Sequence, residues 1–112
     1  MTKPAWLTVL TTTDSEDKAH SLAQGVVEAR LAACVQIAAP VISVYRWQDT
    51  IETTREWQLL FKTTAERYDE LEAHLLAAHD YETPEIVAIP VVRGSARYLD
   101  WVSAETAPVV PL

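Results

Sequence analysis

The chain has 112 residues, of which 49% are hydrophobic and 22% charged, the size and composition of one soluble globular domain. Its net charge is −7 and its nine Lys and Arg residues are scattered, which excludes the basic face that nucleic-acid binding requires. A lone cysteine excludes an internal disulfide, and the N-terminal run is too short and polar for a signal peptide or membrane span, so we expect a cytoplasmic protein that binds no membrane.

The first part of the chain predicts a strand followed by an amphipathic helix. Residues 6–13 are rich in Val, Leu and Thr, the composition of a strand. Between 15 and 31 the apolar residues recur at the spacing of one buried helix face. Thr13 and Glu16 have capping-box spacing, with Asp14 as a rival cap, so we expect the helix to begin here.

A long hairpin is predicted next. The stretch 33–48 is β-rich but contains Pro40, which cannot donate to a strand ladder and predicts a bulge or an edge. After a polar turn, residues 51–64 alternate as a second strand. Because these strands are longer than the others, the hairpin should project beyond the sheet. It carries large apolar side chains that favour a subunit interface, with local cover of the open sheet face as the alternative: Tyr45, Trp47, Ile51 and Trp57.

The second half predicts a helix, a strand and a last helix. Thr63 and Glu66 again have capping-box spacing and open a helix over about 65–78. The apolar run 85–92 predicts a buried strand, and 96–106 predicts a short helix. The buried stripe of the middle helix would be Tyr68, Leu71, Leu75 and Ala78.

This order of elements, βαββαβ plus a C-terminal helix, predicts an α+β fold. We expect a ferredoxin-like sandwich, in which a four-stranded antiparallel sheet carries two helices on one face. No composition shift divides the chain. We therefore expect one domain over 1–112, with a core of about 6–106 and a proline-bounded tail over 107–112.

Five segments now match a known family in order and spacing, from about Leu7 to Thr106: "ARLAACVQI" (29–37), "SVYRWQDTIE" (43–52), "EWQLLFKTT" (56–64), "HDYETPEIVAIPV" (79–91) and "YLDWV" (98–102). Together they resemble the divalent-cation tolerance family called CutA. The resemblance implies a ferredoxin-like subunit, a compact homotrimer locked by the long hairpins, and a link to tolerance of copper and other divalent cations.

Four positions depart from the family's pattern. Asp49 stands where the family commonly has Gly in the hairpin turn, and Asp tolerates a left-handed backbone better than most residues. Asp80 replaces the proline of a His-Pro-Tyr motif. Thr11 and Ala78 stand where some members implicated in copper binding carry a cysteine and a histidine. Of that ligand set only His79 remains.

A metal hypothesis therefore rests on a partial ligand set. Copper and zinc sites need two or more Cys or His ligands, and His74 and His79 do not converge on one helix. A strong site within one subunit is disfavoured, and no metal is needed for folding. The alternative is a divalent cation, with copper as the expected metal, that is held between subunits by His79 together with a neighbour's Cys34, Glu56 or Glu85.

The sequence supports a catalytic function less well than a metal-binding one. Cys34 and His79 have the residue types of a nucleophile and its base, but a cysteine inside an apolar strand usually behaves as a small buried hydrophobe. Asp80 either holds His79 in one tautomer or is a solvent-facing turn residue, which turn preference favours. There is no Gly-rich phosphate loop. We expect no enzyme.

Lys62 and Glu56 are expected on one face of a strand, roughly 20 Å apart, so each needs a partner from elsewhere. Glu85 is the candidate partner of Lys62 in an interfacial ion pair, with a ligand-binding lysine as the alternative. Tyr81 belongs to the polar stretch "AAHDYETPEI" (77–86), which we also expect at an interface.

Two functions follow. The leading one is a trimeric, non-enzymatic protein of divalent-cation tolerance that binds metal weakly or between subunits. The alternative is a signalling or adaptor trimer, like the PII proteins of nitrogen regulation, that binds a small anionic ligand or a protein in intersubunit clefts. The alternative rests on analogy between folds.

Overall fold

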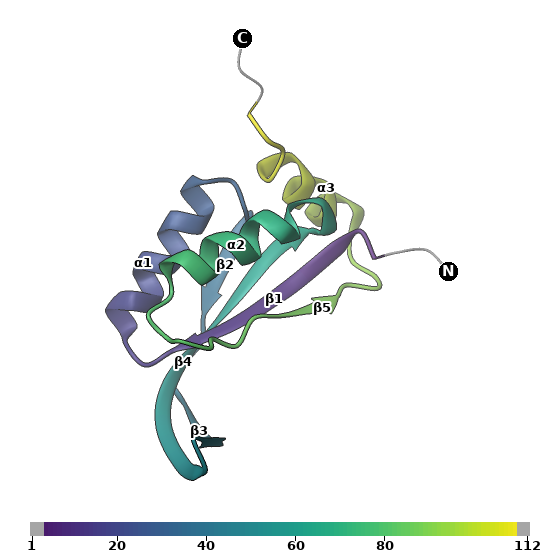
Figure 1. The fold of residues 1–112 in the computed structure, drawn as a ribbon. Coiled ribbons are helices and arrows are strands. Elements are labelled where there is room, and N and C mark those ends of the chain that lie inside the picture. Colours follow the sequence, from purple (N-terminus) through teal and green to yellow (C-terminus); the bar gives the residue numbers. More distant parts are fainter. Residues whose placement is uncertain (1–3, 110–112) are drawn as a thin grey trace.

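The structure is a computed structural model that describes residues 4–109 (Figure 1). Its mixed α+β architecture and its C-terminal helix agree with the prediction, while the predicted tail over 107–112 extends beyond the described residues. The elements are β1 (Trp6–Thr13), α1 (Glu16–Glu28), β2 (Cys34–Ile37), β3 (Val41–Trp47), β4 (Thr50–Thr64), the 3₁₀ turn η1 (Ala65–Arg67), α2 (Tyr68–Ala78), β5 (Val87–Pro90) and α3 (Ala96–Glu105).

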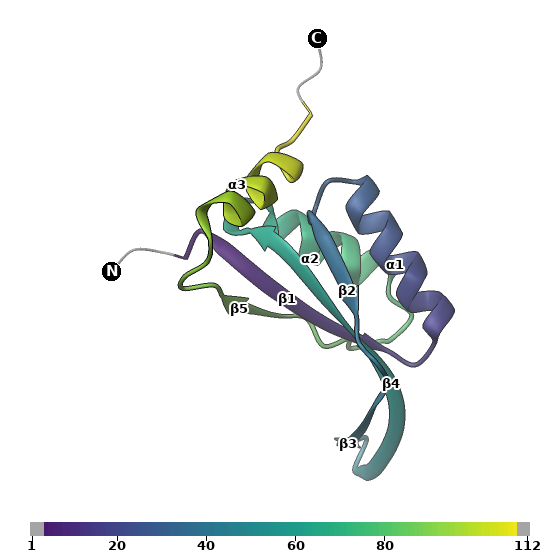
Figure 2. The ribbon, with the colours of Figure 1, turned by 180° about the vertical axis from the view of Figure 1, so that it is seen from behind.

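One antiparallel sheet is covered by helices on one face. Its strand order is β2-β4-β1-β5, and β3 pairs with β4 beyond β2. Helices α1 and α2 lie side by side on the same face of this sheet (Figures 1 and 2). The core between them contains apolar residues from both layers, including Val9, Leu22, Val26, Leu59, Phe61, Leu71 and Leu75. Within residues 4–109, none of the helices has both the length and the apolarity needed to cross a bilayer.

The other face of the sheet is apolar toward one edge. Leu10 lies opposite Leu60 on β4 and opposite Val87 on β5, so the three side chains share this face, and Ile89 follows at the alternate position. Val87 and Ile89 are 45% and 51% exposed, and all of β5 is exposed. The prediction of a buried last strand is therefore wrong for the single chain, because β5 is an edge strand that pairs only with β1.

The predicted long strand over 33–48 is divided in two at Pro40. Ile37 of β2 lies opposite Leu59, whereas Val41 of β3 lies opposite Glu56. Between these two pairs, residues 38–40 on one strand oppose only residues 57–58 on β4, and this one-residue excess defines a bulge. The bulge predicted from Pro40 is confirmed, and it shifts the pairing register of β3 by one residue.

Beyond this bulge the β3–β4 hairpin curves away from the helical layer and projects past the sheet (Figure 1). Its two-residue turn has positive φ at Gln48 (47°) and Asp49 (64°), and Trp47 pairs with Thr50. Positive φ at both positions is the backbone of a type I′ hairpin turn, which matches the twist of the strands. The expectation that Asp49 accepts a left-handed conformation is confirmed.

Both predicted capping boxes are wrong. Helix α1 is capped by Ser15, whose Oγ accepts the backbone N–H of Lys18 at 3.2 Å. Thr63 does not cap a helix, because it is buried and donates its hydroxyl to the carbonyl of Leu31 at 2.7 Å. Helix α1 also ends at Glu28 instead of 31, with Arg30 at φ 60°. The predicted stripe of α2 is buried or packed against the core.

Candidate functional site

A cleft of about 500 Å³ lies between β3 and the segment 81–85 that joins α2 to β5. Several residues singled out from the sequence meet here although they come from separate segments. The lining residues are Thr12 from β1, Ser43, Tyr45 and Trp47 from β3, Glu56 from β4, and Tyr81, Glu82, Thr83 and Glu85 from the joining segment. We call this the β3 cleft.

The bulge at Pro40 decides which side chains of β3 reach the cleft. Val41 lies directly opposite Glu56, so the odd-numbered residues of β3, including Tyr45 and Trp47, share the face of Glu56. In the register of β2, the even-numbered residues would share that face instead. The one-residue slip therefore places aromatic rings in the cleft where the even positions would have placed Val44 and Arg46.

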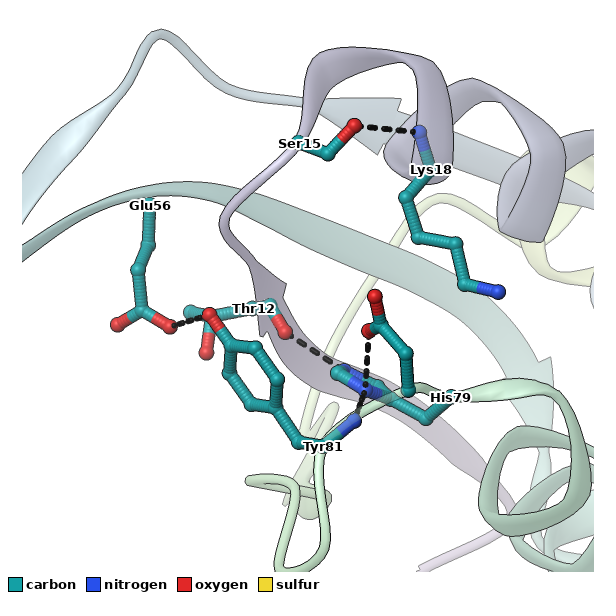
Figure 3. Close-up of polar contacts among 7 residues, drawn as sticks. Thr12, Ser15, Lys18, Glu56, His79 and Tyr81 are labelled. Atoms are coloured by element: carbon teal, nitrogen blue, oxygen red, sulfur yellow. Dashed lines mark hydrogen bonds and ion pairs between the residues drawn. The ribbon is translucent and has the colours of Figure 1, made fainter. Parts of the chain in front are cut away.

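Glu56 and Tyr81 are joined at the inner side of the cleft. The Tyr81 hydroxyl donates to Glu56 Oε2 at 2.8 Å (Figure 3), and Glu56 is only 6% exposed. Burial of the ring and, after it, the hydrogen bond to the Glu56 carboxylate raise the pKa of Tyr81 above its ordinary value of 10.0. The phenol therefore remains a protonated donor at neutral pH.

His79 lies behind this pair and uses both ring nitrogens within the chain. Nε2 is 2.7 Å from the carbonyl oxygen of Thr12, and Nδ1 accepts the backbone N–H of Tyr81 at 3.0 Å (Figure 3). Because a carbonyl can only accept and an N–H can only donate, the ring is the neutral tautomer with its proton on Nε2. A metal ion could reach His79 only if one of these bonds opened.

Asp80 is a weak partner for this histidine. Its Oδ1 is 3.5 Å from His79 Nδ1, and its side chain is 54% exposed. Nδ1 already accepts from Tyr81, so in the neutral ring it has no proton to share with the carboxylate. The geometry favours the solvent-facing turn residue over a partner that fixes the tautomer.

Lys62, another candidate residue, lies far from the β3 cleft. Lys62 pairs with Thr8 on one side and with Cys34 on the other, six residues along β4 from Glu56. Glu85 precedes β5, whose first residue Val87 pairs with Leu10, so Glu85 lies at the other end of β1 from Lys62. Lys62 and Glu85 therefore form no ion pair within one chain, and the pair across an interface stays a prediction. Lys62 instead lines a smaller cavity of about 220 Å³ beside α3, together with Arg93.

The remaining hairpin aromatic, Trp57, is half-buried and does not line the cleft. The Arg55 guanidinium lies 5.4 Å from its ring centroid, within cation–π range. Cys34 is half-buried and unpaired. Among the described residues there is no group of three His, Cys, Asp or Glu side chains that could hold a metal ion.

Glu82, Thr12 and Ser43 also line the cleft, and sequence reasoning did not select them. Glu82 could have been found, because it lies between Tyr81 and Glu85 in the stretch already chosen. Thr12 and Ser43 carried no signal, since their role comes only from the strand register. With them the cleft has aromatic, hydroxyl and carboxylate groups and no Lys, Arg or His among its lining residues.

These observations define a class: a small α+β protein in which an antiparallel sheet extends into a projecting hairpin beside an acidic, aromatic cleft. The sequence profile of the family described as "CutA1 divalent ion tolerance protein" matches residues 7–105. The chain belongs to this family.

Named relatives agree over most of the chain. The divalent-cation tolerance protein CutA of Thermus thermophilus is 44% identical over 98 residues, which cover 88% of this chain and 95% of that protein. A solved structure of CutA1 from the psychrotrophic bacterium Shewanella sp. has a TM-score of 0.90 at 36% identity, covering 94% of this chain and 98% of that one. The chloroplastic protein CutA of Arabidopsis thaliana is 34% identical over 89% of this chain, which spans only 55% of that protein.

Proposed function

We propose that this protein contributes to tolerance of divalent cations, copper in particular, by binding metal weakly at sites that several copies complete, without catalysing a reaction. Family membership supports the metal role. The observation that carries the mechanism is the β3 cleft, which collects Glu56, Glu82 and Glu85 without a basic residue. Carboxylates that line one cleft attract cations, but among the described residues of one chain they form no group that could hold a metal ion by itself.

The assembly in this proposal is a homotrimer of ferredoxin-like subunits in the cytoplasm. Exposed apolar side chains support association: Ile42, Val44 and Ile51 on the hairpin, and Val87 and Ile89 on the edge strand. An apolar edge strand left uncovered in a monomer is an aggregation hazard, and a neighbouring copy would cover it. The strand order β2-β4-β1-β5 supports the ferredoxin-like subunit, and the unpaired Cys34 supports a reducing compartment.

The candidate ligands differ in what each would require. Glu85 is exposed and lines the cleft, so it can bind a cation without rearrangement. His79 must first release either Thr12 or Tyr81. Cys34 lies by Lys62, away from the cleft, so only the Cys34 of another copy could join the same site.

Calorimetric titration of the native assembly with Cu(II) and Zn(II) tests the metal role. We expect saturable Cu(II) binding that weakens at least about threefold in Glu85→Gln, because an exposed carboxylate ligand contributes modestly. Glu105→Gln removes the same charge from the end of α3 and should leave the affinity unchanged. Binding that is equal in all three proteins, or no saturable binding, would contradict the proposal.

The signalling or adaptor trimer is the second candidate. One observation favours it: Lys62 and Arg93 both line the small cavity beside α3, and neither forms an ion pair within residues 4–109. Two cations at one cavity fit an anionic ligand. This candidate would be the better one if the protein bound inorganic phosphate saturably, lost that binding in Lys62→Gln, and did not bind Cu(II).

A further inference from the structure

The β3 cleft contains a largely buried carboxyl group that forms no ion pair with a Lys or Arg of residues 4–109. Glu56 is only 6% exposed, and its one hydrogen bond is the 2.8 Å contact that Oε2 accepts from the Tyr81 hydroxyl. The ion pairs within residues 4–109 are Arg67–Glu70 and His79–Asp80, so no Lys or Arg neutralises Glu56. Buried carboxylates are normally paired with a cation, because desolvation of an unpaired charge is costly.

The unused oxygen of Glu56 is available to a ligand. No described residue donates a hydrogen bond to Oε1, which is not among the buried atoms that lack a partner and so remains open to the cleft; Figure 3 shows this oxygen turned away from Tyr81. Glu56 lines the 500 Å³ cleft, which is large enough for a small molecule. A positively charged group in the cleft would supply the missing partner.

The walls of the cleft specify what kind of cation fits. Aromatic side chains line it, namely Tyr45, Trp47 and Tyr81, and their π faces attract cations. Tyr45 is held in place by a 2.8 Å hydrogen bond between its hydroxyl and Thr54 Oγ1. Aromatic rings around one buried carboxylate are the surroundings typical of alkylated ammonium recognition, because such ions are weakly hydrated and present apolar methyl groups.

A bare divalent metal fits these surroundings less well. Hard cations need several converging oxygen ligands, and no group of three acidic or His and Cys side chains converges within the described residues. Glu82 and Glu85 are exposed at the rim, where they attract either kind of cation. The contrast between an aromatic interior and a single buried charge favours an organic ion.

We propose that the β3 cleft binds a small organic cation that carries an alkylated ammonium group, with Glu56 as its counter-ion and Tyr45, Trp47 and Tyr81 as its aromatic enclosure. This proposal shares the β3 cleft with the metal role proposed above, but it rests on Glu56 and the aromatic interior, whereas the test of the metal role rests on the exposed carboxylate of Glu85. Tyr81 has a second part in it, because its hydroxyl fixes the orientation of the Glu56 carboxylate.

The test uses choline as a probe, with its uncharged carbon isostere 3,3-dimethylbutan-1-ol as the matched ligand. Binding to the native assembly is followed by calorimetry and by tryptophan fluorescence, and the contribution of Trp47 to the signal is taken from the comparison with Trp47→Leu. We expect choline to bind saturably and the neutral alcohol to bind at least about tenfold more weakly, because only the charged ligand compensates Glu56.

Three variants locate the site. Glu56→Gln removes the charge and keeps an oxygen to accept from Tyr81, so it should fold and lose at least about tenfold in choline affinity. Trp47→Leu removes an aromatic wall at a side chain 38% exposed and should weaken binding without unfolding the chain. Glu105→Gln changes the same charge on α3 and should leave choline binding unchanged.

The proposal would be overturned if choline did not bind saturably to the unmodified protein. This holds also if the reason were that a cation of a neighbouring copy already occupies the cleft. Equal affinity for choline and its neutral isostere would also overturn it, as would unchanged choline binding in both Glu56→Gln and Trp47→Leu. Cu(II) titration of the same samples keeps the two proposals apart, because metal binding can persist when choline binding is absent.

Discussion

His79 connects three parts of the chain through one buried ring. It begins the segment after α2, its Nε2 contacts the Thr12 carbonyl on β1, and its Nδ1 orients the backbone of Tyr81. The ring also packs against Tyr81, with centroids 4.7 Å apart. By fixing Tyr81, it indirectly fixes the hydroxyl that donates to Glu56.

We therefore predict that His79→Ala destabilises the protein by about 3 kcal/mol, because it removes two buried hydrogen bonds and leaves a cavity. Asp80→Asn should cost less than about 0.5 kcal/mol, since its carboxylate is exposed and contacts an occupied nitrogen. Urea unfolding of the two variants measures both values. A loss in Asp80→Asn as large as that in His79→Ala would show instead that the imidazole is charged and paired with Asp80.

Sequence reasoning selected His79 for its chemistry but could not show that the ring is already bonded. Its partner Thr12 lies 67 residues earlier in the chain, and the contact depends on how β1 and the end of α2 meet. For the same reason Glu56 and Tyr81 were both selected, while their hydrogen bond across 25 residues was not foreseen. Residue type indicates which groups can react, but only the three-dimensional structure shows which of them contact one another.

The hairpin turn allows a test of backbone strain at the scale of one element. Gln48 and Asp49 both have positive φ, which costs a side-chain-bearing residue free energy that glycine avoids. We predict that Asp49→Gly stabilises the protein by about 0.5 kcal/mol, the relief of strain exceeding the entropy that glycine adds to the unfolded chain.

The neighbouring position provides the control for this turn. Thr50→Gly should destabilise the protein by about 1 kcal/mol, because Thr50 is a strand residue paired with Trp47 and needs no glycine. Both changes are compared by chemical unfolding at one protein concentration. Destabilisation by Asp49→Gly as large as that by Thr50→Gly would mean that the turn is not under strain at residue 49.

Elements with a local signal were predictable, and elements defined by their surroundings were not. The helix stripes and the bulge at Pro40 follow from periodicity and from a missing N–H donor, which are properties of the segment itself. The two candidate caps, Thr13 and Asp14, were both wrong, since the choice of Ser15 depends on where the chain leaves β1. The apolar β5 has the composition of a buried strand but lies at an edge.

That exposed edge matters for the whole molecule. Helices cover one face of the sheet, while Leu10, Leu60, Val87 and Ile89 remain together on the other. A layered fold is more stable when each apolar face is packed against another layer, and in the assembly proposed above another copy would supply the layer over this part of the sheet. The net charge of −7 limits non-specific association, so a closed assembly with complementary surfaces is the expected outcome.

Sedimentation of a lysine variant tests this assembly. We predict that the unmodified protein sediments at micromolar concentration as three 12.5 kDa chains, and that Ile89→Lys sediments mainly as one. A lysine at this position would place an unpaired charge in the contact between copies, at a cost of several kcal/mol. Leu76→Lys makes the same change on α2, where the side chain is 55% exposed, and should leave three chains together. A monomeric unmodified protein, or an Ile89→Lys variant that still assembles as Leu76→Lys does, would show that the open sheet face is not a contact between subunits.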